Sequence, residues 1–111
     1  MSRWESLYGY QRAVRTGDRI ITSGTTAPGP TAAAQATAAF GIALDALAAH
    51  GASASDVVRT RMYITDRAFA DEVGQVHSSL FGAVRPVTTM VVVAGLIDES
   101  LLVEVEVEAQ L

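Results

Sequence analysis

The end of the chain alternates aliphatic and acidic side chains without interruption over residues 102–109. Successive side chains of a β-strand point to opposite faces of a sheet, so this pattern predicts a strand with one aliphatic face and one acidic face. The acidic face carries Glu104, Glu106 and Glu108. Three neighbouring carboxylates repel one another, so water, a basic partner strand or a binding site must offset their charge.

A second two-faced strand is predicted over residues 57–64, where Arg59, Arg61 and Tyr63 alternate with apolar or β-branched residues. We expect the apolar set, which begins at Val58, to pack beneath helices. The other face of this strand is basic, so its arginines could form cross-strand ion pairs with the glutamates or bind an anionic ligand. An assembly of several copies could also pair these charges between chains.

Two helices are predicted in the remaining sequence. The first covers residues 31–50, which are rich in alanine, carry an apolar face and end before Gly51. The second begins after Asp66, a residue that can cap a helix, and ends near Gly82. Its apolar side chains recur at spacings of four, three and four, which is typical of one buried helical face.

Short extended segments complete the pattern. They cover residues 10–15, 19–23 and 88–94, and the first two flank a Thr-Gly-Asp turn. The resulting order is β-β-α-β-α-β-β. It predicts a single α+β domain over residues 1–111, with two helices on one face of a mixed sheet.

The composition narrows the class of protein. The formal net charge is −4 and the basic residues are scattered, which argues against nucleic-acid binding. All eight basic residues are arginines, which favours fixed ion pairs and anion recognition. Cysteine is absent, which excludes disulfides and thiolate metal sites and fits a reducing cytoplasm. We find no leader segment and no apolar stretch long enough to cross a bilayer, so we expect a cytoplasmic protein without a membrane partner. His50 and His77 are isolated and no cofactor motif is present, so we expect neither a metal nor a cofactor.

Six segments occur in the order found in one known family. They are residues 10–14 (Tyr-Gln-Arg-Ala-Val), 17–24 (Gly-Asp-Arg-Ile-Ile-Thr-Ser-Gly), 56–60 (Asp-Val-Val-Arg-Thr), 63–66 (Tyr-Ile-Thr-Asp), 86–89 (Pro-Val-Thr-Thr) and 103–106 (Val-Glu-Val-Glu). On these segments the sequence resembles the Rid family, the YjgF-type reactive-intermediate deaminases that are also called endoribonuclease L-PSP-like. The resemblance implies a chorismate-mutase-like fold and a homotrimer with small-molecule pockets at the subunit interfaces.

Active members of this family hydrolyse enamines and imines, such as 2-aminoacrylate, to a keto acid and ammonia. The resemblance implies that Glu104 positions water and that Tyr10, Ser23 and Gly24 line the pocket. Two of these positions also have an ordinary structural interpretation. Tyr10 could equally pack at a sheet edge, and Gly24 could simply end a strand.

The family's arginine that holds the substrate carboxylate is replaced in this sequence. Aligned on Pro86, its position is occupied by Thr88. Arginine offers a carboxylate two parallel charged hydrogen bonds, whereas a threonine hydroxyl offers one neutral donor. Charge-assisted hydrogen bonds contribute about 1.5–3 kcal/mol each, so losing two weakens carboxylate binding by roughly a hundredfold or more. Met90 lies on the same side of its strand as Thr88 and either makes the pocket apolar or packs in the core.

Three functions remain open from the sequence. It favours a trimer that binds or slowly hydrolyses a small ligand other than a simple imino acid, with Glu104 orienting water and Thr88 offering a neutral contact. The second possibility is a true imine deaminase in which Arg85 or Arg61 replaces the missing arginine. The third is a non-catalytic trimer that binds a small ligand or regulates a partner.

Overall fold

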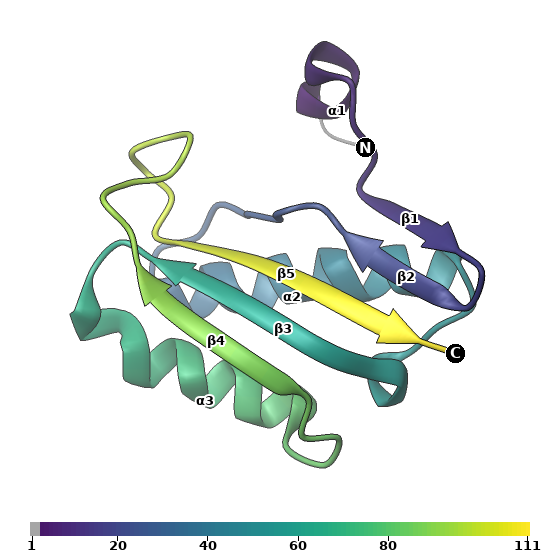
Figure 1. Cartoon of the computed structure of the whole chain (residues 1–111). Coiled ribbons are helices and arrows are strands. Elements are labelled where there is room, and N and C mark those ends of the chain that lie inside the picture. Colours follow the sequence, from purple (N-terminus) through teal and green to yellow (C-terminus); the bar gives the residue numbers. More distant parts are fainter. Residues whose placement is uncertain (1–2) are drawn as a thin grey trace.

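The alternating end of the chain forms the central strand of a five-stranded mixed sheet. In the computed structural model, which describes residues 3–111, the strand order is β1-β2-β5-β3-β4 (Figure 1). The strands are β1 (Ala13–Thr16), β2 (Arg19–Thr22), β3 (Val57–Ile64), β4 (Val87–Val92) and β5 (Val103–Gln110). β5 is antiparallel to both of its neighbours, whereas β3 and β4 are parallel.

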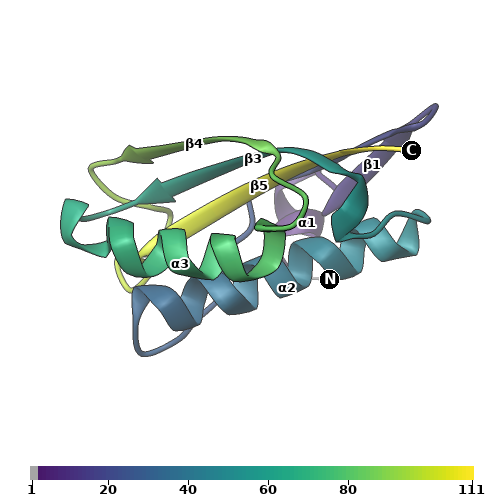
Figure 2. The same ribbon diagram turned by 90° about the horizontal axis from the view of Figure 1, so that it is seen from below.

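Two long helices cover one face of this sheet and leave the other face open (Figure 2). The helices are α1 (Arg3–Tyr8), α2 (Ala32–Ala49) and α3 (Ala70–Phe81), with 3-10 turns at Ala54–Asp56 and Arg67–Phe69. The α+β class and the predicted order of strands and long helices are therefore confirmed. The short helix α1, which precedes β1, was not predicted, because its six residues are too few for a helical period to be recognised.

The core lies between the open sheet and the two long helices. Val103, Val105 and Val107 of β5 point into it and are buried, whereas the glutamates between them are only half-buried. Phe40 of α2 is fully buried and packs edge-on against Phe81 of α3, with ring centroids 5.4 Å apart. The period of two in β5 thus separates a core face from a polar face, as the sequence predicts.

Helix α2 owes its position to small side chains. Thr31 caps its first turn by accepting a hydrogen bond from the backbone N–H of Ala34, and its buried face consists mainly of alanine. By length and composition alone α2 is apolar enough to cross a membrane, contrary to the sequence expectation. In this structure, however, the helix packs along the sheet and buries Phe40 and Leu47 there, which is the arrangement of a core helix.

The prediction that Val58 packs beneath the helices is wrong. Val57 pairs with Ala109 and Arg59 pairs with Glu108, so Val58 is an extra residue in β3. This bulge shifts the alternation by one position, which buries Val57 and leaves Val58 46% exposed. From Arg59 onward the side chains alternate as predicted.

A buried glutamine of α2 joins two loops at one end of the sheet. The side-chain amide of Gln35 donates hydrogen bonds to the carbonyl groups of Gly29 and Ser100, each 3.1 Å long. Its side-chain oxygen accepts a hydrogen bond of 2.8 Å from the backbone N–H of Leu102. The connector before α2 and the loop before β5 are therefore held to the same side chain.

Candidate functional site

The carboxylate of Glu104 lies against the backbone of Gly24, which follows β2. Thr25 forms an antiparallel bridge with Val105, so this segment of backbone lies directly beside β5. A Cβ atom at position 24 would lie 1.9 Å from Oε2 of Glu104. Only glycine leaves room for the carboxylate in this position.

The surroundings of Glu104 favour its protonated form. Burial raises the pKa of this carboxyl above its ordinary value, and the negative charge of Glu106 raises it further. The guanidinium of Arg12 acts in the opposite direction and lowers it. A half-buried carboxyl with a raised pKa is a stronger base than an exposed one and is a candidate general acid-base group.

Arg12 is a cation of this site whose role was not predicted from the sequence. Its guanidinium donates hydrogen bonds to the carbonyl of Gly24 (2.7 Å) and to the hydroxyl of Thr25 (3.1 Å). It also lies 3.6 Å from a carboxylate oxygen of Glu5 and 5.5 Å from the ring centroid of Tyr10. Arg12 lies in segment 10–14, which resembles the family and contains the predicted pocket residue Tyr10. That position was the one sequence signal that could have indicated Arg12.

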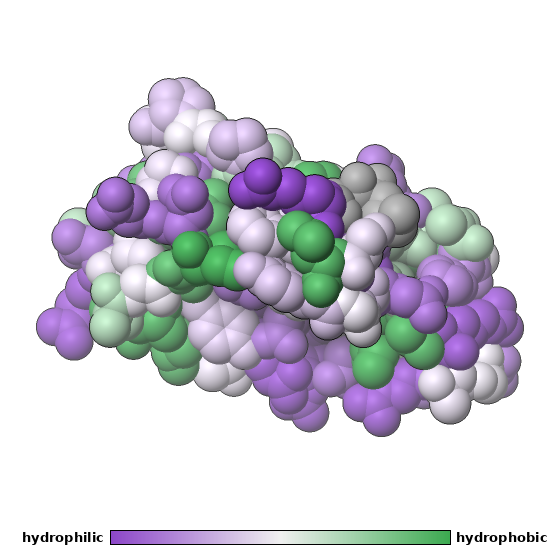
Figure 3. Space-filling view, turned by 90° about the horizontal axis from the view of Figure 1, so that it is seen from above, coloured by the Kyte–Doolittle hydropathy of each residue, from purple (hydrophilic) through white to green (hydrophobic). Residues whose placement is uncertain are grey.

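Glu104, Gly24, Tyr10 and Arg12 line one cavity with a volume of about 450 Å³. The rest of the wall comes from helix α1, the connector before α2 and the loop before β5. These residues are Arg3, Trp4, Thr26, Ala27, Pro28, Ile97, Asp98, Ser100 and Leu101. On the side of the molecule shown in Figure 3, hydrophobic residues form small groups between hydrophilic ones.

A second hollow lies on the other side of Glu104. Its volume is about 310 Å³, and it is lined by Gly24, Tyr63, Val93, Gly95, Leu96, Glu104 and Glu106. The Tyr63 hydroxyl donates a hydrogen bond to Glu106, and this bond is the main cause of the raised pKa of Tyr63. Glu104 therefore stands between two hollows, while Glu106 is held by Tyr63.

Thr88 and Met90 lie on the opposite side of the sheet from Glu104. In the parallel pair of β3 and β4, Thr88 is opposite Thr60 and Met90 is opposite the buried Met62. The Thr60 hydroxyl donates a 2.7 Å hydrogen bond to the Thr88 hydroxyl. Thr60 also lies 2.7 Å from the Nε2 atom of His77 on α3, whose pKa is lowered by burial. Within one chain, Thr88 therefore faces the helices and does not meet Glu104.

The other candidate residues are also separate from the Glu104 cavity. Arg85 is exposed in the turn before β4, has a φ of 59° and lines none of the hollows that contain Glu104. Ser23 donates a hydrogen bond to the carbonyl of Gln11 and lines a different hollow, which it shares with Tyr10. Arg61 lies 3.5 Å from Glu108, several residues further along the sheet. Among residues 3–111, no group of acidic or histidine side chains is arranged to hold a metal ion.

Comparison with known proteins finds relatives over the whole chain. The family described as endoribonuclease L-PSP matches residues 1–111. Rv2704 of Mycobacterium tuberculosis, a member of the highly conserved YjgF/YER057c/UK114 family, is 48% identical, and its structure aligns with a TM-score of 0.97 over 99% of this chain and 93% of its own. An uncharacterized protein of Streptomyces coelicolor is 45% identical over 115 residues, which cover 97% of this chain and 86% of that protein.

A more distant relative has the same fold. The YjgF gene product of E. coli is 25% identical, with a TM-score of 0.85 over 91% of this chain and 87% of its own. The chorismate-mutase-like fold expected from the resemblance is thereby confirmed.

Proposed function

Because the chain belongs to the endoribonuclease L-PSP family, which includes the YjgF-type proteins, we propose that it binds a small organic molecule beside Glu104 and hydrolyses an enamine or imine there. The observation that carries this proposal is the position of the Glu104 carboxylate. It lies on a glycine backbone, borders two hollows and has a raised pKa, beside Tyr10 and Arg12.

The proposed reaction needs one group that both accepts and donates a proton. Water adds to the carbon of a protonated imine, and the Glu104 carboxylate accepts the proton that this water loses as the new C–O bond forms. The resulting carboxylic acid then returns the proton to the nitrogen. The C–N bond breaks as the hydroxyl group gives its proton to the Glu104 carboxylate and becomes a carbonyl. The carbonyl compound leaves, and the ammonia or amine takes up this proton and leaves as its cation. The raised pKa of Glu104 supports the first step, because it makes the carboxylate a stronger base.

The substrate that we propose lacks a carboxylate next to the imine carbon. Thr88 stands where the family resemblance implies a carboxylate-binding arginine, and within one chain it faces the helices, away from Glu104. Arg12 borders the Glu104 cavity, but its guanidinium already contacts Gly24, Thr25 and Glu5. Arg85 and Arg61 lie elsewhere in the chain and give little support to a true amino-acid imine deaminase.

We test the reaction with Glu104→Gln, which keeps the shape of the side chain and removes its proton exchange. The assay measures the release of a carbonyl compound from a neutral imine and detects the product by its coupled reduction. We expect the rate of release to fall by about 10²–10⁴-fold, the usual contribution of a general acid-base group. Glu99→Gln is the matched control, because Glu99 is exposed and lines neither hollow beside Glu104.

Unchanged hydrolysis in Glu104→Gln would refute the catalytic role. A wild-type rate equal to spontaneous hydrolysis would instead favour a non-catalytic ligand-binding protein. The contacts that already occupy the Arg12 guanidinium favour this second candidate, because they leave the site with few free charged donors.

A further inference from the structure

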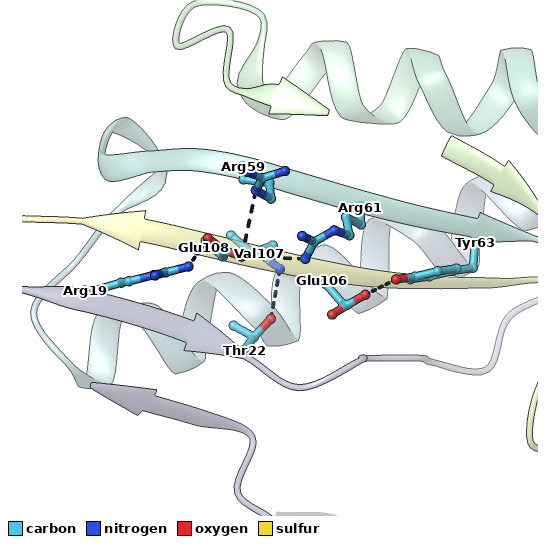
Figure 4. A network of polar contacts seen from close by, with 8 residues as sticks. All are labelled: Arg19, Thr22, Arg59, Arg61, Tyr63, Glu106, Val107 and Glu108. Carbon is cyan, nitrogen blue, oxygen red and sulfur yellow. Dashed lines mark hydrogen bonds and ion pairs between the residues drawn. The ribbon is translucent and has the colours of Figure 1, made fainter. Parts of the chain in front are cut away.

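Three arginines surround one carboxylate at the other end of the open sheet face (Figure 4). Glu108 of β5 lies 2.8 Å from Arg19 of β2, 3.5 Å from Arg61 and 3.9 Å from Arg59, both of β3. The glutamate side chain is only 17% exposed, whereas those of the three arginines are 38–58% exposed. We call this group the arginine cluster: Arg19, Arg59, Arg61 and Glu108.

Most of the hydrogen-bond donors in the arginine cluster have no acceptor among residues 3–111. A guanidinium group carries five N–H donors, yet only Arg19 donates a hydrogen bond to Glu108. Arg59 and Arg61 approach the carboxylate at longer distances and donate no hydrogen bond to any residue within 3–111. The nearest further carboxylate, Glu106, accepts the hydrogen bond from Tyr63.

Charge and space both favour an additional anion at this position. The three arginines, together with Glu106 and Glu108, line a hollow of about 200 Å³, so its wall is positive although the whole chain carries a net charge of −4. Arg59 and Arg61 are two residues apart on one face of β3, and their like charges repel each other. An anion between them would offset this repulsion and accept the free donors.

We propose that the arginine cluster binds a small oxyanion with two negative charges, such as a phosphate group or a dicarboxylate. Guanidinium groups match both anions, because their paired N–H donors fit two oxygens at once. This site is separate from the proposed Glu104 site. Glu104 is opposite Tyr63 and Glu108 is opposite Arg59, which places them about 13 Å apart along β5.

The experiment is titration calorimetry of the purified full chain with inorganic phosphate at low salt, with succinate as a second arm. Sodium chloride at the same ionic strength corrects for screening. We expect saturable phosphate binding that is weakened at least tenfold in Arg59→Gln and in Arg61→Gln. Succinate binding in place of phosphate binding would identify a dicarboxylate as the ligand class. Arg67→Gln is the control, because Arg67 is exposed in a 3-10 turn outside this hollow.

Glu108→Gln should change the affinity for the anion in the opposite direction to the arginine variants. Removing the competing carboxylate should tighten anion binding, whereas removing an arginine should weaken it. Circular dichroism confirms that each variant is folded. The proposal is overturned if neither anion binds above the chloride control, or if binding is the same in Arg59→Gln and Arg67→Gln. It is also overturned if neither anion binds and the arginine variants lose their assembly, which would assign the arginine cluster to ion pairs between copies.

Discussion

At the scale of single residues, two identical side chains on one strand face have different surroundings. Glu104 has a raised pKa and borders two hollows, whereas Glu108 is surrounded by three guanidinium groups. The alternating sequence makes them equivalent, and only the neighbouring strands distinguish them. Segments 19–22 and 57–64 bring arginines to one end of β5, and the glycine after β2 brings its backbone to the other.

The raised pKa of Glu104 predicts that this residue destabilises the folded protein at neutral pH. Its proton leaves the unfolded chain near the ordinary value of 4.5 and leaves the folded chain only at higher pH. The folded state therefore loses stability relative to the unfolded state as the pH rises from about 4.5 through the folded pKa. We expect Glu104→Gln to be more stable than the wild type at neutral pH, with the gain disappearing near pH 4.

Urea unfolding midpoints at the two pH values measure this effect, and Glu99→Gln again serves as the control. A variant that is less stable than the wild type at neutral pH would contradict the prediction. Greater stability together with lower activity would mark Glu104 as a residue kept for function at the expense of folding.

At the scale of elements, hydrophobic periodicity predicted most of the structure. The limits of β3 were predicted to the residue, and those of α2 to within one residue at each end. Helix α3 ends at Phe81 as predicted but begins only at Ala70, because Asp66 caps a 3-10 turn that precedes the helix. The bulge at Val58 was not predictable, because two consecutive valines fit either face of a strand. The role of Arg12 was also missed, because its contacts with Gly24 and Glu5 join segments that no periodic pattern relates.

The packing between α2 and α3 predicts a large effect for Phe40→Ala. Phe40 is fully buried and contacts the rings of Phe81 and His77, so truncation would leave a cavity. We expect a loss of about 3–5 kcal/mol in the free energy of unfolding, measured by urea denaturation. Ile42→Ala is the matched control, because Ile42 lies on the same helix and is 42% exposed. Similar losses in both variants would contradict this account of the core.

At the scale of the whole molecule, the open face of the sheet is the feature that a single chain leaves uncovered. It is charged along its centre, and apolar side chains flank the charges: Ile21 is 41% exposed, Val87 61% and Val91 40%. The resemblance implied a homotrimer with pockets between subunits, and this state of assembly remains a prediction. Within one chain, Thr88 and Met90 lie on the helix-covered side of the sheet, opposite Glu104.

We therefore expect the protein to be a trimer in solution. Light scattering coupled to size-exclusion chromatography at micromolar concentration would give three times the chain mass of 11.7 kDa. Val87→Asp should lower this mass, because it places a charge on an apolar side chain at the edge of the open face. Val58→Asp is the comparison variant, and it tests whether a new charge at another exposed valine of the sheet lowers the mass in the same way. A monomeric wild type would exclude a pocket between subunits and leave only the hollows within one chain.

The side chain of Gln35 has a consequence for how the protein can change during evolution. Its amide holds both the connector before α2, at Gly29, and the loop before β5, at Ser100, and residues of these two segments line the cavity beside Glu104. Part of the wall of the cavity beside Glu104 is thereby held from inside the core. If the proposed function holds, a substitution on the buried face of α2 would change which ligand is accepted without altering any residue that touches it, so ligand preference would diverge between relatives whose cavity linings are identical.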